Sequence, residues 1–148
     1  KLDRLDHGLN SIFNSRGREE GDVLWEVRLD RSLILVRRFG EDRISRESNL
    51  TVPMGQWVHL AGTLSVATGE SRVYLNGEFA GKDIGPLGPM TLGVARLGQW
   101  DPGDGGHRRE LRGRMDEFAI WQRALTGEEI KKLTEEGKPN SRWPTQFE

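Results

Sequence analysis

The residues best suited to bind a ligand are Trp100, Asp101, Asp104 and His107, which share one glycine-rich stretch. Two carboxylates three positions apart, together with backbone carbonyls that glycine leaves accessible, are the oxygen ligands that calcium takes. The Trp100 ring beside them could stack on a sugar ring. These four residues are therefore the first positions to test for ligand binding, with Asp101 and Asp104 as candidate calcium ligands. The alternative is a solvated loop with Asp-Pro-Gly turn chemistry and Trp100 closing the core edge, because a calcium site usually has more than two charged ligands.

Asp116 and Glu117 are the second acidic candidates, in a stretch that is typical of a strand. Adjacent positions on a strand face opposite sides, so these two carboxylates cannot act together on one bond as acid and base. Retaining glycoside hydrolysis needs two carboxyl groups about 5 Å apart, and the spacing of Glu110, Asp116 and Glu117 offers no such pair on one face. We therefore expect Asp116 to have a structural role, accepting hydrogen bonds from neighbouring loop amides.

The other polar candidates also favour structure over catalysis. His59 stands alone in an alternating stretch, and neither it nor His7 has a second histidine at metal-ligand spacing. The chain contains no cysteine, which excludes disulfides, thiolate catalysis and cysteine zinc sites. It carries no serine-histidine-aspartate set, phosphate-binding loop or dinucleotide fingerprint. We therefore predict that the protein is not an enzyme.

An antiparallel β-structure has to position these candidates, because short apolar runs alternate with clusters of Gly, Pro, Asn and Asp. In Val23–Leu29 every odd-numbered residue is apolar, which predicts a strand with one buried face. The charged, glycine-containing stretch Phe39–Ser48 favours a loop or an irregular edge strand. The predicted strands are 23–29, 33–38, 57–65, 72–76, 78–84, 95–100 and 111–122.

Two local motifs predict a tight turn and a helix. Asn76-Gly77 indicates a type I′ hairpin turn, because both central residues of that turn need a positive φ. Thr126 is followed three residues later by Glu129, which forms a capping box at the start of a helix. Gly137 ends that helix. Its narrow apolar stripe predicts that the helix lies on one edge of the domain.

Several motifs occur in a characteristic order: Trp57-x-His59, then Tyr74-Leu75-Asn76-Gly77, then Gly113-x-x-Asp116-Glu117, and finally Arg123-Ala124-Leu125. This order resembles the laminin-G-like, concanavalin A-like jelly-roll family, convincingly over residues 57–133 and more loosely over residues 10–36. The resemblance implies an all-β antiparallel jelly-roll sandwich with one short C-terminal α-helix. It implies structural roles for Trp57, His59, Asn76, Gly77, Gly113, Asp116, Thr126 and Glu129.

The resemblance also implies domain boundaries. Ser11–Gly17 together with Leu24–Val27 is similar to the version of the domain appended to bacterial membrane-bound sigma-factor regulators of the ferric-citrate regulator type. In the family an opening strand normally precedes the position of Lys1 and pairs beside the last strand. We expect a jelly-roll domain over residues 1–137, with its N-terminal strand missing from this sequence, and a tail or linker over residues 138–148.

Size, composition and charge narrow the functional classes. The 148 residues are enough for one ordinary domain, and the formal net charge of −1 gives no field of one sign for attracting nucleic acid or an anionic membrane. Only 34% of the residues are hydrophobic, but the five tryptophans can bury large areas. We expect Trp25, Trp57 and Trp121 to pack in the core or between the sheets.

The predicted function is that of a non-catalytic carbohydrate-binding or adhesion module in a larger exported or membrane-anchored protein, in the periplasm or on the cell surface. The alternative is a protein-interaction or architectural sensory domain without a small ligand. A glycoside hydrolase is a distant third, since it would need converging carboxylates in a groove. The expected partners are a glycan or protein ligand and neighbouring domains of the parent chain, with no nucleic acid and no insertion of this domain into a membrane.

Overall fold

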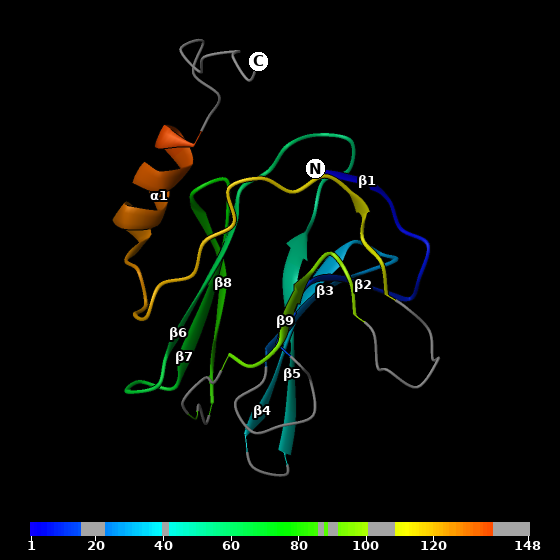
Figure 1. Cartoon of the computed structure of the whole chain (residues 1–148). Coiled ribbons are helices and arrows are strands. Elements are labelled where there is room, and N and C mark those ends of the chain that lie inside the picture. The colour runs from blue at the N-terminus through cyan, green and yellow to red at the C-terminus, as the bar shows by residue number, and fades with distance from the viewer. Residues whose placement is uncertain (16–22, 40–41, 86–87, 89–91, 101–108, 138–148) are drawn as a thin grey trace.

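The computed structural model describes residues 1–15, 23–39, 42–85, 88, 92–100 and 109–137, with the backbone alone for residues 36–39 and 42–49. Two β-sheets pack face to face, and one helix lies outside the smaller sheet (Figure 1). The larger sheet has the order β5-β4-β3-β2-β9, and the smaller one the order β6-β7-β8. Every ladder between these strands is antiparallel. The predicted antiparallel jelly-roll sandwich is confirmed.

The elements have the following bounds. The five-stranded sheet contains β2 (Leu9–Ser15), β3 (Val23–Arg28), β4 (Ser32–Phe39), β5 (Asp42–Thr51) and β9 (Ala95–Leu97). The three-stranded sheet contains β6 (Leu60–Ser65), β7 (Glu70–Leu75) and β8 (Glu78–Ile84). A small ladder joins β1 (Leu2–Arg4) to β10 (Arg112–Gly113), and α1 is Gly127–Glu136.

The main core lies between the two large sheets. Val27 and Leu33 of the five-stranded sheet belong to the same buried cluster as Val73 of the three-stranded sheet. A second cluster contains Phe13 of β2, with Trp25 of β3 packed against it. Trp25 is therefore an inter-sheet residue, as expected. Burial of these apolar side chains, at roughly 1.5–3 kcal/mol for each large one, is what holds the layers together.

The strand β3 is buried on both faces, whereas its sequence predicted one buried face. Leu24 and Glu26 point away from the inter-sheet core, yet only 7% and 0% of their surfaces are exposed. The cause is residues 98–100 and 109–111, which lie against this face of the sheet and place Trp100 against Leu24. Leu29, predicted to be buried, is 60% exposed because β3 already ends at Arg28.

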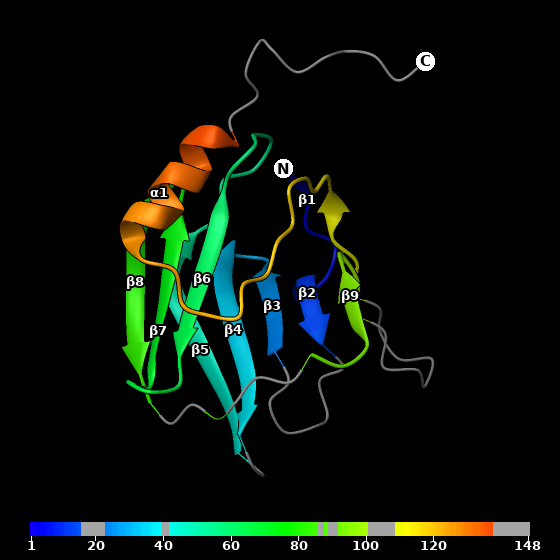
Figure 2. The same ribbon diagram turned by 60° about the vertical axis from the view of Figure 1, so that its left-hand side comes forward.

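The predicted turn and helix are confirmed. Asn76 and Gly77 have φ values of 52° and 83°, as a type I′ turn requires. At the helix start, Thr126 Oγ1 accepts from the Glu129 amide while a Glu129 carboxylate oxygen accepts from the Thr126 amide. Figures 1 and 2 show that α1 covers the outer face of the three-stranded sheet, so the helix lies over a face and not along an edge.

Replacing Gly77 by Ala is expected to lower the free energy of unfolding by about 1–2 kcal/mol. The positive φ strains any residue with a Cβ, and the added Cβ would lie 3.2 Å from both Lys131 Cα and Thr134 Oγ1. The turn would therefore push against α1. Urea denaturation measures the loss, and Gly8→Ala is the control, because an added Cβ there meets nothing within 4 Å. Equal losses in both variants would contradict this account.

Other strand boundaries differ from the predictions for identifiable reasons. The stretch 39–48, predicted as a loop or an irregular edge strand, overlaps β5, which is an edge strand next to β4 and continues to Thr51, so the edge-strand alternative is confirmed. The strand expected at 57–65 begins only at Leu60, and the one expected at 95–100 ends at Leu97. No separate strand was predicted over β2. A register shift between Ser11 and Phe13 interrupts its alternation, which hides the period-two pattern.

The predicted last strand, Leu111–Gln122, is wrong over most of its length. Only Arg112–Gly113 forms a ladder, and residues 114–121 have no regular structure. Glu117 has a φ of 54°, which a strand does not permit. A strand needs a hydrogen-bonded neighbour, and among the described strands none pairs with residues 114–121. This unpaired segment runs across the gap beside β6 (Figure 2).

Candidate functional site

Of the four residues predicted to bind a ligand, only Trp100 is placed by the structure. Asp101, Asp104 and His107 lie outside the described residues. Trp100 and Arg109 are the described residues on either side of this stretch, and they form the base of the loop.

Backbone hydrogen bonds join the base of the loop to the five-stranded sheet. The Arg109 amide donates to the Trp100 carbonyl at 3.2 Å, which joins the two ends of the loop directly. The Ser11 amide of β2 donates to the Arg109 carbonyl at 2.9 Å. One step further out, the Leu111 amide donates to the Gly98 carbonyl at 2.8 Å. These bonds hold the loop ends at a defined place, as a rigid scaffold does for a binding loop.

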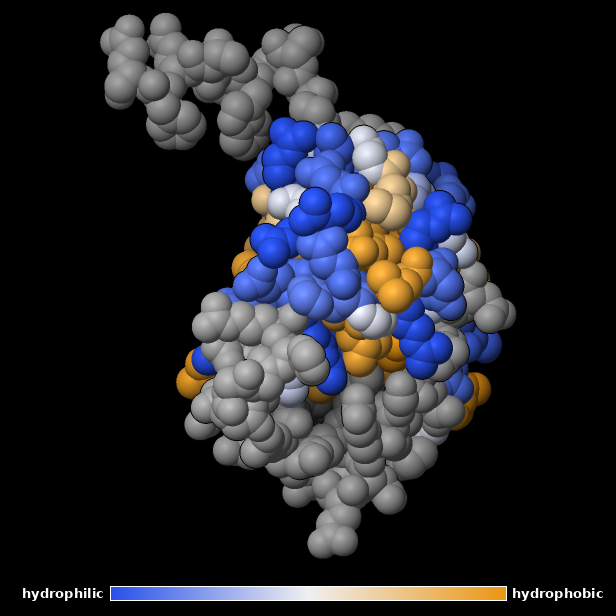
Figure 3. Space-filling model, turned by 90° about the vertical axis from the view of Figure 1, so that its right-hand side faces the viewer, coloured by the Kyte–Doolittle hydropathy of each residue, from blue (hydrophilic) through white to orange (hydrophobic). Residues whose placement is uncertain are grey.

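Three side chains from distant parts of the chain stack at this base. Trp100 packs against the buried Leu24, and the Arg109 guanidinium carbon lies 4.2 Å from the centre of the Trp100 ring, a cation–π contact. Arg109 Nη1 in turn lies 2.7 Å from Glu26 Oε1. Figure 3 views the molecule from the right-hand side of Figure 1 and shows hydrophobic side chains exposed in a band between hydrophilic ones. The orientation of the Trp100 ring is thus set by an ion pair beneath it.

Sequence patterns did not predict the buried polar residues Glu26 and Asn14 beneath Trp100. Glu26 is 0% exposed, and its Oε2 has no hydrogen-bond partner among the described residues. Asn14 is similar, since its Nδ2 donates to the Gln99 carbonyl and to Ser11 Oγ while its Oδ1 has no described partner. A charged residue inside an otherwise apolar strand was the available signal for Glu26. Because Glu26 is shielded from solvent, its carboxylate positions Arg109 and cannot reach a substrate.

The acidic residues near β10 have separate partners. Glu110 Oε2 lies 3.0 Å from Arg112 Nη2, and Asp116 Oδ1 accepts the Glu117 backbone amide at 3.0 Å. Gly113 has a steric requirement of its own, because an added Cβ would overlap the Lys1 carbonyl oxygen. Among the described residues, no group of three or more His, Cys, Asp or Glu side chains is placed to hold a metal ion.

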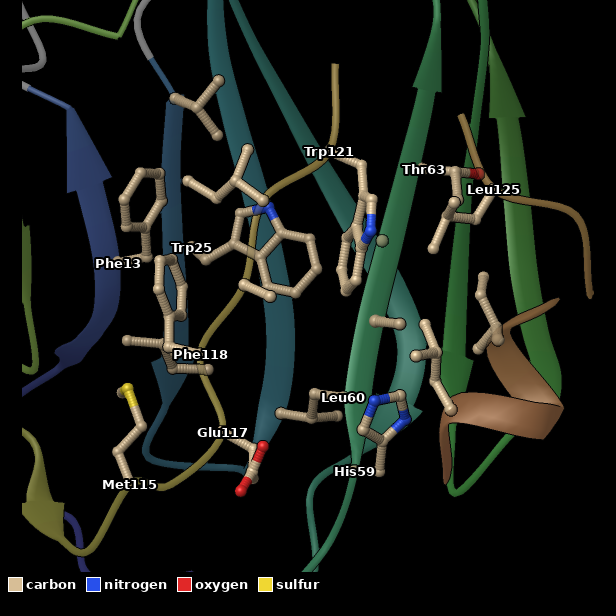
Figure 4. Close-up of a pocket in the computed structure, with 18 of the residues that line it drawn as sticks. Phe13, Trp25, His59, Leu60, Thr63, Met115, Glu117, Phe118, Trp121 and Leu125 are labelled. Carbon is tan, nitrogen blue, oxygen red and sulfur yellow. The ribbon is translucent and has the colours of Figure 1, made fainter. Parts of the chain in front are cut away.

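A large apolar groove opens between β6 and residues 114–123, and we call it the β6 groove. Its volume is about 690 Å³, and its two walls are residues 57–64 and 114–123. Phe118 reaches the floor and stacks on Phe13 with ring centres 5.3 Å apart, while Trp121 lies beside β6 (Figure 4). Trp57 and Trp121 were expected to pack in the core, but they are 54% and 46% exposed because they border this open groove.

His59 connects the start of β6 to the turn and to the helix. Its amide donates to Asn76 Oδ1 at 2.9 Å, its carbonyl accepts from the Asn76 amide at 2.8 Å, and its Nδ1 lies 2.8 Å from Thr134 Oγ1. The Thr134 hydroxyl donates to the Ile130 carbonyl, which leaves its oxygen able to accept a hydrogen bond from His59 Nδ1 in the tautomer that carries the hydrogen there. This arrangement indicates a structural histidine.

Acidification is expected to destabilise the protein through His59. Partial burial lowers the pKa of His59 from its usual value near 6.5, since desolvation penalises the charged ring. The unfolded chain therefore binds the proton more readily, and the stabilisation present above pH ~6.5 is lost as the pH falls below that value. Thermal unfolding between pH 7.5 and 5 should show a smaller drop in Tm for His59→Gln than for the parent. His7→Gln is the control; a drop unchanged in His59→Gln would refute the assignment.

Comparison with known proteins identifies the family. The model of the concanavalin A-like lectin/glucanase superfamily, in its laminin-G-like form, matches residues 3–131. The chain belongs to this superfamily. The match covers both sheets and ends within α1. The sequence match and the strand order therefore support the same lectin-like jelly-roll fold.

Relatives of this lectin-like domain include the pentraxin-related proteins PTX3 of mouse and human. Their identities are 30% over 118 residues and 31% over 110 residues, covering 72% and 68% of this chain but only 30% and 28% of theirs. The chain thus spans less than a third of these curated relatives. Similar solved structures are a SAP-like pentraxin from Limulus polyphemus and a candidate carbohydrate-binding protein from Bacteroides ovatus, which share its fold.

Each of the two solved structures matches most of this chain. The Limulus pentraxin has a TM-score of 0.64 at 20% identity and covers 90% of this chain and 66% of its own. The Bacteroides protein has a TM-score of 0.69 at 19% identity and covers 89% of this chain and 38% of its own.

No helix in the described part of the lectin-like domain has the length and apolar character needed to cross a bilayer.

Proposed function

We propose that this lectin-like domain is a non-catalytic carbohydrate-binding module of a larger exported or membrane-anchored protein. The observation that carries the proposal is the pinned base of the loop that follows Trp100, where Arg109 and Glu26 hold the ring in place. That loop contributes Asp101, Asp104 and His107 in the sequence. Membership of a superfamily that contains lectins supports the ligand class.

Calcium is the ion we propose for Asp101 and Asp104, because hard cations take carboxylate and backbone oxygens. The parent protein would work outside the cytoplasm. A membrane-bound sigma-factor regulator is one such parent, proposed from the Ser11–Gly17 and Leu24–Val27 motifs alone.

A thermal-shift titration tests the proposal with calcium, then a chelator, then a panel of oligosaccharides. A ligand that binds only the folded state at about one hundred times its Kd stabilises by roughly 2.7 kcal/mol, which raises Tm by several degrees. We expect a rise with calcium and sugar that Asp101→Ala combined with Asp104→Ala abolishes. Asp3→Ala is the matched control, because Asp3 is an exposed residue paired only at the surface with Lys1. No shift with any of these ligands would refute the carbohydrate proposal.

An architectural or protein-interaction module is the second candidate, and the β6 groove favours it. Exposed apolar patches of this kind are uncommon on a monomer that works alone and mark sites where another polypeptide packs. The groove and the loop base are separate features, so the two candidates are tested by separate variants. Calcium and sugar titrations address the loop alone.

A further inference from the structure

Two buried acceptor oxygens on the outer face of the five-stranded sheet lack a hydrogen-bond donor in the described part of the chain. They are Oε2 of Glu26 and Oδ1 of Asn14, whose residues are 0% and 1% exposed. A buried polar atom without a hydrogen bond is costly, so such atoms in native proteins nearly always have a partner in the protein or in bound water. The two oxygens therefore point to a bound group that donates hydrogen bonds.

Ser11 brings the two acceptors together. It lies directly opposite Glu26 in the ladder of β2 and β3, where side chains on one face have Cβ atoms about 4.5–5.5 Å apart. Ser11 Oγ also accepts a hydrogen bond from Asn14 Nδ2 at 3.4 Å. Both side chains therefore neighbour the Ser11 hydroxyl, whose own hydrogen can donate to a third group.

Other contacts fix the orientation of both acceptors. Asn14 Nδ2 donates to the Gln99 carbonyl, so turning the amide by 180° would bring two oxygens together, and Oδ1 must face away from Gln99. Glu26 Oε1 lies 2.7 Å from Arg109 Nη1, which leaves Oε2 as the oxygen without a described donor. The two acceptors thus keep their directions without any rearrangement of the sheet.

We propose that Ser11 Oγ, Asn14 Oδ1 and Glu26 Oε2 bind one internal water molecule. The water donates its two hydrogens to the two acceptors and accepts the hydroxyl hydrogen of Ser11. This gives it the three hydrogen bonds that are typical of a buried water. The water completes the hydrogen bonding of Glu26, the residue that holds Arg109 against Trp100. The site belongs to the sheet and does not depend on whether the loop after Trp100 binds sugar.

Charge and ligand number favour water over a metal ion. Glu26 and Arg109 carry opposite charges that compensate each other, so a cation would leave an uncompensated charge in a buried place. Calcium takes about six to eight oxygen ligands, whereas this site offers one carboxylate oxygen, one amide oxygen and one hydroxyl. A neutral molecule with two hydrogens to donate matches the two acceptors.

A high-resolution crystal structure of the 148-residue chain tests the site. We expect one density peak about 2.6–3.2 Å from each of the three oxygens, as hydrogen bonds to a water require. A peak about 2.3–2.6 Å from them, with further oxygen ligands, would identify a cation and overturn the proposal. The absence of a peak, or a protein donor at that position, would also overturn it.

A matched pair of variants tests the site in solution. Ser11→Thr keeps the hydroxyl, and Ser11→Val has nearly the same shape without it. Oxygen-17 relaxation dispersion of the solvent counts the water molecules that stay bound inside a protein. We expect Ser11→Val to lose one such water relative to the parent and Ser11→Thr to lose none. An equal number in Ser11→Val and the parent would contradict the proposal.

Discussion

Replacing Arg109 by Met is expected to lower the free energy of unfolding by about 2–4 kcal/mol. The guanidinium is the described partner of Glu26, which is completely shielded from solvent, so its loss leaves a buried charge without compensation. The variant also loses the cation–π contact with Trp100 and loosens the base of the candidate loop. Guanidinium chloride denaturation gives the magnitude, and any ligand found for the loop should bind more weakly to this variant.

A double-mutant cycle separates the ion pair from simple packing. Glu26→Met alone should cost less than Arg109→Met, because Arg109 is 24% exposed and can turn toward water. Glu26→Met with Arg109→Met should return stability to within about 1 kcal/mol of the parent, since a buried ion pair replaced by apolar groups of similar volume is often neutral. Additive losses in the double variant would show that Arg109 acts through packing and not through Glu26.

Replacing Gly62 by Ala is expected to cost about 1–3 kcal/mol by overpacking. A Cβ at this position would overlap Cζ2 and Cη2 of the Trp25 indole, which crosses from the opposite sheet and rests on the glycine. The ring would have to leave the inter-sheet core and turn toward the β6 groove. Thermal or urea unfolding measures the loss.

Trp25→Phe tests this explanation directly. The smaller ring leaves room for the added methyl group, so Gly62→Ala should cost less in the Trp25→Phe background than in the parent. Gly8→Ala is again a control for glycine replacement in open space. If the two backgrounds lose the same free energy, backbone entropy and not the Trp25 contact explains the sensitivity of Gly62.

Some features of this chain followed from short stretches of sequence. The Asn76-Gly77 turn and the Thr126–Glu129 capping box need only a few neighbouring residues, because their hydrogen bonds and φ values are local. The order of the motifs from Trp57 to Leu125 also predicted the jelly-roll sandwich, which the structure and the family match confirm. Local chemistry and motif order therefore determined the fold class.

The tertiary structure alone decided which surfaces are buried and where pairing ends. Leu24 and Glu26 look like the solvent face of β3, and Trp100 and Arg109, from a distant part of the chain, cover them. Residues 114–121 look like a strand in sequence, yet a strand exists only where a neighbour supplies hydrogen bonds. Both outcomes depend on contacts between residues far apart in the chain. Local residue patterns cannot encode such contacts, which is why the Glu26–Arg109–Trp100 base and the β6 groove emerged only from the fold.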